Sequence, residues 1–162
     1  MSAHRQIRGA APVGYLHELD PTEEGAVLCF RRWNAGHRAQ AEIWDQFATA
    51  LGPSAVESAL DSLNTVCDLC ARHGRRPLVR HAVNCPCLGG DESCFATFIG
   101  YACEGAREDA LLIATTMVRP DIAPMLVAHA AQFGLALRRV VADNAFQTKK
   151  VNYSPTKPMT VH

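Results

Sequence analysis

Apolar residues recur mostly three and four positions apart along this chain, which is the spacing of an amphipathic helix. The clearest helix start is Asp20-Pro21-Thr22-Glu23, where an N-cap residue precedes a proline at the first helical position and an acidic residue follows. Further helical stretches follow as far as residue 142, separated by short connections. Strand signals are nearly absent. The pattern therefore predicts an all-α protein, a compact bundle of six to eight short helices with no significant sheet.

Helix-capping and helix-breaking residues predict where these helices begin and end. Ser54-x-x-Glu57 predicts a capping box for the third helix, Asp91 an N-cap for the fifth, and Gly134 a break in the last. Pro86 should end a short fourth helix. The expected helices cover residues 20–36, 37–52, 54–74, 77–85, 91–105, 107–118 and 121–141.

The length of 162 residues fits one domain, since domains usually run roughly 100–200 residues. We expect a single helical domain over residues 20–142, with a Cys/His loop at 67–94. Residues 1–19 are weakly patterned and are predicted to form an N-terminal arm. Residues 143–162 contain every Lys of the chain and show no helical period, so an extended C-terminal tail is expected.

Composition excludes several classes of protein. The chain is 48% hydrophobic and 20% charged, which is ordinary for a globular protein and excludes wholesale disorder. The 16 basic and 16 acidic residues balance, so nucleic acid is disfavoured as a partner. No apolar run approaches the roughly 20 residues of a membrane span, and no secretory signal pattern opens the chain. These features predict a cytoplasmic protein without a membrane segment.

The cysteines carry the strongest chemical signal. Five of the seven fall between residues 67 and 94, together with His81. On a helix His81 and Cys85 would share one face, Cys87 would follow the turn at Pro86, and Cys94 would start the next helix. Because Cys and His are preferred zinc ligands, this spacing predicts one structural zinc ion per chain, bound by His81, Cys85, Cys87 and Cys94.

Cys67 and Cys70 are reserve ligands. With Cys85 and Cys87 they would form a four-cysteine site, which zinc or, less favourably, iron could occupy. Both also lie on an apolar helical stripe, where a free cysteine packs as a small hydrophobic residue. A site with four protein ligands is closed to water, so the pattern favours a binding or regulatory module over an enzyme, and no catalytic residue is assigned.

A function of a different class uses the same cysteines without metal. Closely spaced thiols occur in redox switches, where a thiolate of low pKa pairs with a resolving cysteine. Cys85 with Cys87, or Cys67 with Cys70, could therefore serve a thiol-based redox protein or sensor.

Four arginines precede this loop, namely Arg72, Arg75, Arg76 and Arg80. They are expected either to form a solvated surface with carboxylate partners or to contact an anion, since Arg favours phosphate. A DNA-binding regulator is the weakest alternative, because no second recognition helix is evident. The sequence leaves the protein or small-molecule partner unknown, and apolar faces over 107–118 and 121–141 could support a homodimer.

Overall fold

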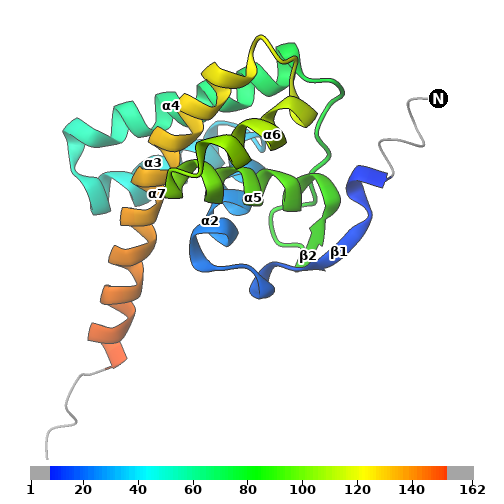
Figure 1. The fold of residues 1–162 in the computed structure, drawn as a ribbon. Helices are drawn as coiled ribbons and strands as arrows, with labels where there is room; N and C mark the ends of the chain where they lie inside the picture. The colour runs from blue at the N-terminus through cyan, green and yellow to red at the C-terminus, as the bar shows by residue number, and fades with distance from the viewer. Residues whose placement is uncertain (1–7, 153–162) are drawn as a thin grey trace, which may run out of the picture.

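The structure, a computed structural model, describes residues 8–152, and for residues 145–152 it describes the helical backbone alone. This part of the chain is mostly α-helical, with one short 3-10 helix and a small antiparallel sheet, so the predicted helical bundle is confirmed (Figure 1). The elements are, in order, β1 (Pro12–Tyr15), η1 (Leu16–Glu18), α2 (Pro21–Trp33), α3 (His37–Leu51), α4 (Pro53–His73), β2 (Cys87–Gly89), α5 (Gly90–Glu104), α6 (Arg107–Met117) and α7 (Ala123–Asn152).

Helix α7 is the central element of the bundle, and every other α-helix contacts it. Its buried face includes Phe133, whose ring stacks on that of Phe47 from α3 with the centroids 6.2 Å apart. Gly134 does not break the helix, contrary to the sequence prediction. A Cβ atom at this position would lie 2.8 Å from the Cβ atom of Cys103, so glycine allows α5 to approach α7 closely. This close packing offsets the intrinsic cost of glycine in a helix, about 1 kcal/mol.

The C-terminal half of α7 differs from the prediction of an extended tail. The helix continues to Asn152, past the expected boundary at residue 143, and residues 153–162 lie outside the described residues. Figure 1 shows this end of α7 projecting from the bundle. Residues 123–144 are long and apolar enough to cross a membrane by length and composition. In this fold the same apolar face packs against the other helices, which is compatible with a soluble protein.

Helix starts follow the sequence signals in part. The Asp20 carboxylate accepts hydrogen bonds from the backbone N–H groups of Thr22 and Glu23, at 2.8 and 2.9 Å, as predicted. The capping box predicted at Ser54 is absent, because α4 already begins at Pro53. Its N-cap is Gly52, whose φ of 83° is a conformation that glycine adopts readily.

Residues 75–86 form an irregular loop, so the predicted fourth helix is wrong. A helix there would leave the Ala82 carbonyl without its usual donor, because Pro86 has no N–H. Proline also disfavours helical backbone at the residue before it, Cys85. The segment retains one turn, in which the Cys85 N–H donates to the Ala82 carbonyl at 3.0 Å.

The predicted N-terminal arm is attached to this loop. Strand β1 pairs with β2 in an antiparallel two-stranded sheet, with Tyr15 opposite Cys87. Two further backbone bonds flank the sheet, from Leu16 N–H to the Pro86 carbonyl at 3.0 Å and from Gly90 N–H to the Ala11 carbonyl at 3.1 Å. Leu16 also packs with Leu88 in a small apolar cluster outside the main core. The arm therefore covers the segment that carries the clustered cysteines.

Candidate functional site

A buried ion pair organises the cysteine loop. Arg31 on α2 and Glu92 on α5 have no exposed side-chain surface, and Nε of Arg31 donates to Glu92 Oε1 at 2.7 Å. Nη2 donates to Glu92 Oε2 at 2.9 Å and to the Cys87 carbonyl at 2.7 Å. Nη1 donates to the carbonyls of Ala82 and Cys85, at 3.1 and 2.7 Å. All five N–H donors of the guanidinium therefore have acceptors, as a buried arginine requires.

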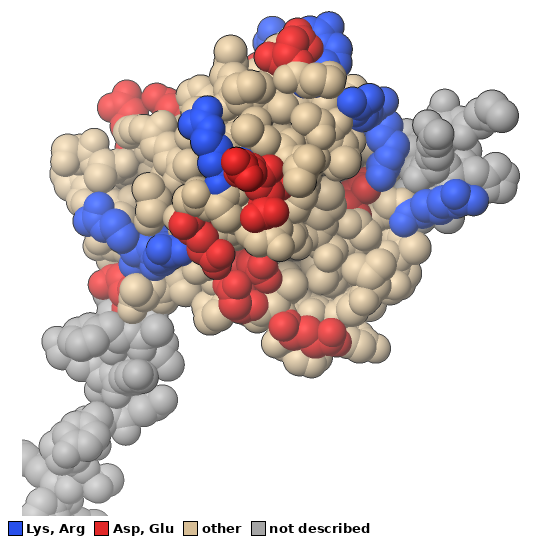
Figure 2. Space-filling model, in the orientation of Figure 1, with Lys and Arg blue, Asp and Glu red and all other residues tan. Residues whose placement is uncertain are grey.

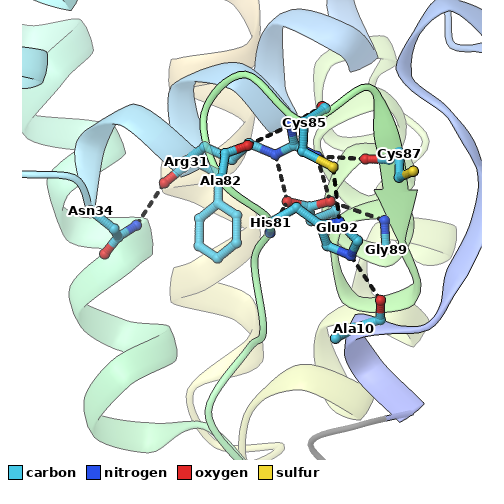
Figure 3. Close-up of polar contacts among 10 residues, drawn as sticks. Ala10, Arg31, Asn34, His81, Ala82, Cys85, Cys87, Gly89 and Glu92 are labelled. Atoms are coloured by element: carbon cyan, nitrogen blue, oxygen red, sulfur yellow. Dashed lines mark hydrogen bonds and ion pairs between the residues drawn. The ribbon is translucent and has the colours of Figure 1, made fainter.

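The Glu92 carboxylate is equally well satisfied. Besides the two bonds from Arg31, it accepts the backbone N–H of His81 at 2.8 Å and that of Gly89 at 3.0 Å. The donors from Arg31, Gly89 and His81 lower the pKa of Glu92 against the opposing effect of its burial, which is the largest single influence. Together Arg31 and Glu92 hold five backbone groups of the loop between residues 81 and 89 (Figure 3).

The loop brings His81 and Cys85 together although neither lies on a helix. Nδ1 of His81 lies 3.4 Å from Sγ of Cys85, and Nε2 lies 2.7 Å from the Ala10 carbonyl oxygen of the N-terminal arm. Figure 3 shows the ring between these two partners. An imidazolium ring can donate from both nitrogens at once, to the thiolate and to the carbonyl. The sequence thus predicted the right neighbours through the wrong local structure.

This contact changes the acidity of both groups. The hydrogen bond from His81 lowers the pKa of the Cys85 thiol, and the backbone N–H of Cys87 adds to the effect. In turn, the hydrogen bond to Cys85 and that to Ala10 raise the pKa of His81. Desolvation and the neighbouring Cys85 raise the pKa of Cys87. Cys85 is therefore the more acidic thiol of the pair and Cys87 the less acidic one.

A comparison with protein-family models, curated proteins and solved structures found no match.

The other cysteines have a different character. Burial raises the pKa values of Cys29, Cys67 and Cys70 to about 12. Cys70 lies in the main hydrophobic core and Cys67 packs against it, which matches the interpretation of these two residues as core side chains. Burial also raises the pKa of Cys103. These thiols are poor nucleophiles near neutral pH, because the thiolate is the reactive form.

Cys94, the fourth predicted zinc ligand, faces a different environment from the other three. Its neighbours are Thr116, Asp91 and Arg76, and burial raises its pKa. Cys94 follows Glu92 by two residues, a rotation of about 200° around a helix. Glu92 faces Arg31 and the cysteine loop, so Cys94 lies on nearly the opposite side of α5. Within residues 8–152, no three His, Cys, Asp or Glu side chains are arranged to hold a metal ion.

The four arginines of the predicted anion contact each have a protein partner. Arg72 pairs with Asp68 at 2.8 Å on the exposed surface of α4. Arg75 donates from Nε to the Thr115 carbonyl at 2.7 Å. On the face drawn in Figure 2, basic and acidic side chains lie side by side.

Arg76 and Arg80 attach the start of the loop to the bundle. Arg76 forms a bidentate ion pair with Asp91, which also accepts the Val79 N–H at 2.7 Å. Asp91 is therefore not the N-cap of α5, which is Gly89. Arg80 donates to the Asn34 carbonyl at 3.5 Å. Arg72 and Arg76 thus have the carboxylate partners expected of a solvated surface, and the anion contact stays a prediction.

Sequence reasoning missed the ion pair of Arg31 and Glu92. One signal was available, since Arg31 follows Val27 by four residues and so falls on the apolar stripe of its helix. A charge on such a stripe needs a buried partner. The local sequence does not identify that partner, Glu92, which lies 61 residues away.

His81→Gln is expected to make Cys85 less reactive near neutral pH. Glutamine removes the cationic donor that lowers the Cys85 pKa, so the pH midpoint for alkylation should rise toward that of an ordinary thiol. The rate at pH 7 should fall roughly threefold for each unit by which the midpoint rises, because the more basic thiolate is also more nucleophilic. The measurement is the iodoacetamide rate at Cys85 from pH 5 to 10. An unchanged midpoint would contradict the role of His81.

Proposed function

We propose that this protein is a thiol-based redox module in which Cys85 is the attacking thiolate and Cys87 the resolving thiol. The observation that carries the proposal is the 3.4 Å contact between His81 Nδ1 and Cys85 Sγ, with a second thiol two residues further along the chain. A thiolate stabilised by an adjacent imidazolium is the typical activated form of cysteine. Its place in a half-buried loop, outside the core, leaves the sulfur open to a reactant.

The chemistry uses a hydroperoxide as the two-electron oxidant. The Cys85 thiolate attacks one oxygen of the peroxide, the O–O bond breaks, and the leaving alkoxide takes a proton from His81 Nδ1. The products are a sulfenic acid at Cys85 and an alcohol. The Cys87 thiol then attacks the Cys85 sulfur, forming the disulfide and releasing water. Overall, the two thiols lose two electrons and the peroxide is reduced to alcohol and water.

A structural zinc ion remains the competing proposal for the same loop. His81, Cys85 and Cys87 share one short segment, which supports a common role. The zinc set also requires Cys94, whose neighbours are Thr116, Asp91 and Arg76. The redox function requires only Cys85 and Cys87, which already influence each other's pKa values. This is why the redox function is preferred here.

The test combines metal content with disulfide mapping. The protein is purified without chelator, its zinc and iron are measured, and it is then treated with one equivalent of hydrogen peroxide. Trypsin cuts after Arg80 and an Asp-directed protease cuts before Asp91, so the peptide 81–90 contains Cys85 and Cys87 alone. We expect less than a tenth of an equivalent of metal and a loss of two hydrogens in this peptide. We also expect Cys87→Ser to retain a sulfenic acid at Cys85 that a dimedone probe captures.

Cys94→Ser is the matched control, because Cys94 belongs to the zinc set and not to the redox pair. Under the redox proposal this variant should form the Cys85–Cys87 disulfide as fast as the wild type. About one zinc per chain that is lost in Cys94→Ser would overturn the redox proposal and establish the metal centre. Failure of the peptide 81–90 to oxidise in metal-free protein would also overturn it.

A further inference from the structure

The contacts of Arg31 bear directly on the chemistry of the thiol pair. Its guanidinium binds the carbonyl oxygens of Cys85 and Cys87, the two residues whose sulfurs would react. It also binds the carbonyl of Ala82, at the other end of the turn. Among the described residues Arg31 forms no hydrogen bond to either sulfur. Its charge lowers the pKa of Cys87 against the larger effects of desolvation and Cys85, and its hydrogen bonds act on the backbone. Such bonds from a buried cation are among the strongest that a loop can receive.

We propose that Arg31 is a positioning residue that holds the Cys85–Pro86–Cys87 backbone in the geometry of the free thiols and thereby makes the disulfide of this pair strongly oxidising. This inference rests on the proposed redox function. The proposed function requires only that Cys85 and Cys87 form a disulfide. The inference adds that the folded chain stabilises the dithiol relative to this disulfide.

Closing the disulfide requires a rearrangement that the loop resists. The two sulfurs must move from a non-bonded contact to about 2.05 Å, with Cα atoms usually 4.4–6.8 Å apart. Only Pro86 separates the cysteines, and its ring fixes φ near −65°. Side-chain rotation within so small a ring is limited, so the backbone of Cys85 or Cys87 has to turn with the sulfurs. That turn moves a carbonyl away from Arg31.

Three further contacts oppose the same movement. Cys87 is paired with Tyr15 in the small sheet, and the Pro86 carbonyl accepts the Leu16 N–H. Sγ of Cys85 is directed at His81, which stabilises the reduced thiolate and not the disulfide. We expect each contact to weaken when the disulfide closes. A fold that stabilises the reduced form of a pair raises its reduction potential.

A pair of this kind passes its disulfide to another dithiol. A partner thiolate attacks Sγ of Cys87, the Cys85–Cys87 bond breaks, and Cys85 leaves as the thiolate, since the sulfur of lower pKa leaves faster. The second partner thiol then attacks the mixed disulfide and releases Cys87. The partner loses two electrons and two protons and gains a disulfide. The inferred substrate class is therefore a protein or peptide dithiol, and hydroperoxide regenerates the oxidised protein.

The first test uses the wild-type chain. The protein is equilibrated in buffers of reduced and oxidised glutathione, once folded and once in denaturant, and the peptide 81–90 is scored by mass. This comparison cancels the intrinsic strain of the small disulfide ring. If the fold prefers the dithiol, the disulfide should be at least tenfold easier to reduce in the folded chain, a difference of about 30 mV. An equal ratio of disulfide to dithiol in the folded and the denatured chain would overturn the inference.

The second test separates the position of Arg31 from its charge. Arg31→Lys keeps a cation beside Glu92 but cannot reproduce the planar fork that binds three carbonyls. We expect the Cys85–Cys87 disulfide of this variant to be at least tenfold harder to reduce than that of the folded wild type. Arg76→Lys is the matched control, because Arg76 pairs with Asp91 at the same end of α5 but binds no carbonyl of the Cys-Pro-Cys segment. The ratio of disulfide to dithiol in Arg76→Lys should equal that of the folded wild type in the same glutathione buffer.

The outcomes are distinguishable from failure of the redox function itself. If the peptide 81–90 forms no disulfide in the wild type under any buffer, the proposed function fails and this inference fails with it. If the disulfide forms but folded Arg31→Lys matches the wild type within twofold, only the inference fails. Circular dichroism establishes that the variant is folded, and should Arg31→Lys not fold, the wild-type comparison decides alone.

Discussion

Arg31→Met is expected to lower the free energy of unfolding by about 3–5 kcal/mol, because it leaves the buried Glu92 carboxylate without its cation. The side chains of both residues have no exposed surface, so solvent cannot replace the lost partner. Three loop carbonyls, at Ala82, Cys85 and Cys87, lose their donors in the same substitution. Urea unfolding at pH 7, followed by circular dichroism, measures the effect.

Two comparisons make this result specific. Arg72→Met removes an exposed ion pair with Asp68 on α4 and should cost less than about 1 kcal/mol. The double variant Arg31→Met with Glu92→Leu removes both buried charges and should recover part of the loss, since well-packed apolar replacements of a buried ion pair are often tolerated. A single Arg31→Met variant as stable as Arg72→Met would contradict the assigned role of the ion pair.

The stability of the single variant should also change with pH. Glu92 has a lowered pKa in the folded wild type, so its ionised form contributes stability above the pKa of the unfolded chain, and this is lost as pH falls through the folded value. Without Arg31, burial dominates and favours the protonated carboxyl. The destabilisation caused by Arg31→Met should therefore become smaller at acid pH.

Cys85 should account for nearly all fast alkylation of the native protein at pH 7. The pKa values of Cys29, Cys67 and Cys70 are about 12. About 10⁻⁵ of such a thiol is ionised at pH 7, against a few per cent of an ordinary thiol, a ratio of about 10³. The greater nucleophilicity of a more basic thiolate offsets roughly half of this on a logarithmic scale. In a Cys87→Ser background, so that this neighbouring thiol does not take over, Cys85→Ser should thus slow the fastest phase at least tenfold.

The measurement is the iodoacetamide rate under native conditions, with the site of the first label mapped in the peptide 81–90. Cys70→Ser is the control, because this buried thiol contributes to the core and not to the fast phase. Its fast phase should equal that of the wild type. A fast phase that persists when Cys85→Ser is added to Cys87→Ser, or a first label outside residues 81–90, would show that the assignment of the reactive thiol is wrong.

Both predictions concern one short loop, and they test its two components separately. The stability of Arg31→Met reports on the framework that holds the loop, whereas alkylation reports on the environment of one sulfur. The glutathione equilibria connect these two measurements. The Arg31–Glu92 ion pair can change the reduction potential of the cysteines only if the loop geometry it holds disfavours closure of the disulfide. Agreement among the three measurements would support a redox site built on a buried ion pair.

Much of the fold follows from signals that act over one or two helical turns. The three- and four-residue spacing of apolar side chains predicted the helices, and Asp20 caps α2 as expected. The proximity of His81 and Cys85 is also local, since a turn of four residues brings them together as a helix would. The burial of Cys67 and Cys70 follows from their place on an apolar stripe. Each of these features depends on neighbours in the sequence.

The predictions that were wrong concern features that depend on segments distant in the sequence. The loop 75–86 is held in its irregular path by Arg31, on another helix, which binds the Ala82 and Cys85 carbonyls. Gly134 continues a helix because Cys103 of α5 lies against it. The sequence alone thus determined a helical bundle and a cluster of cysteine and histidine. Only the tertiary structure decided which thiol has the lowered pKa and what holds its loop, because both depend on segments that meet through packing and not through adjacency in the chain.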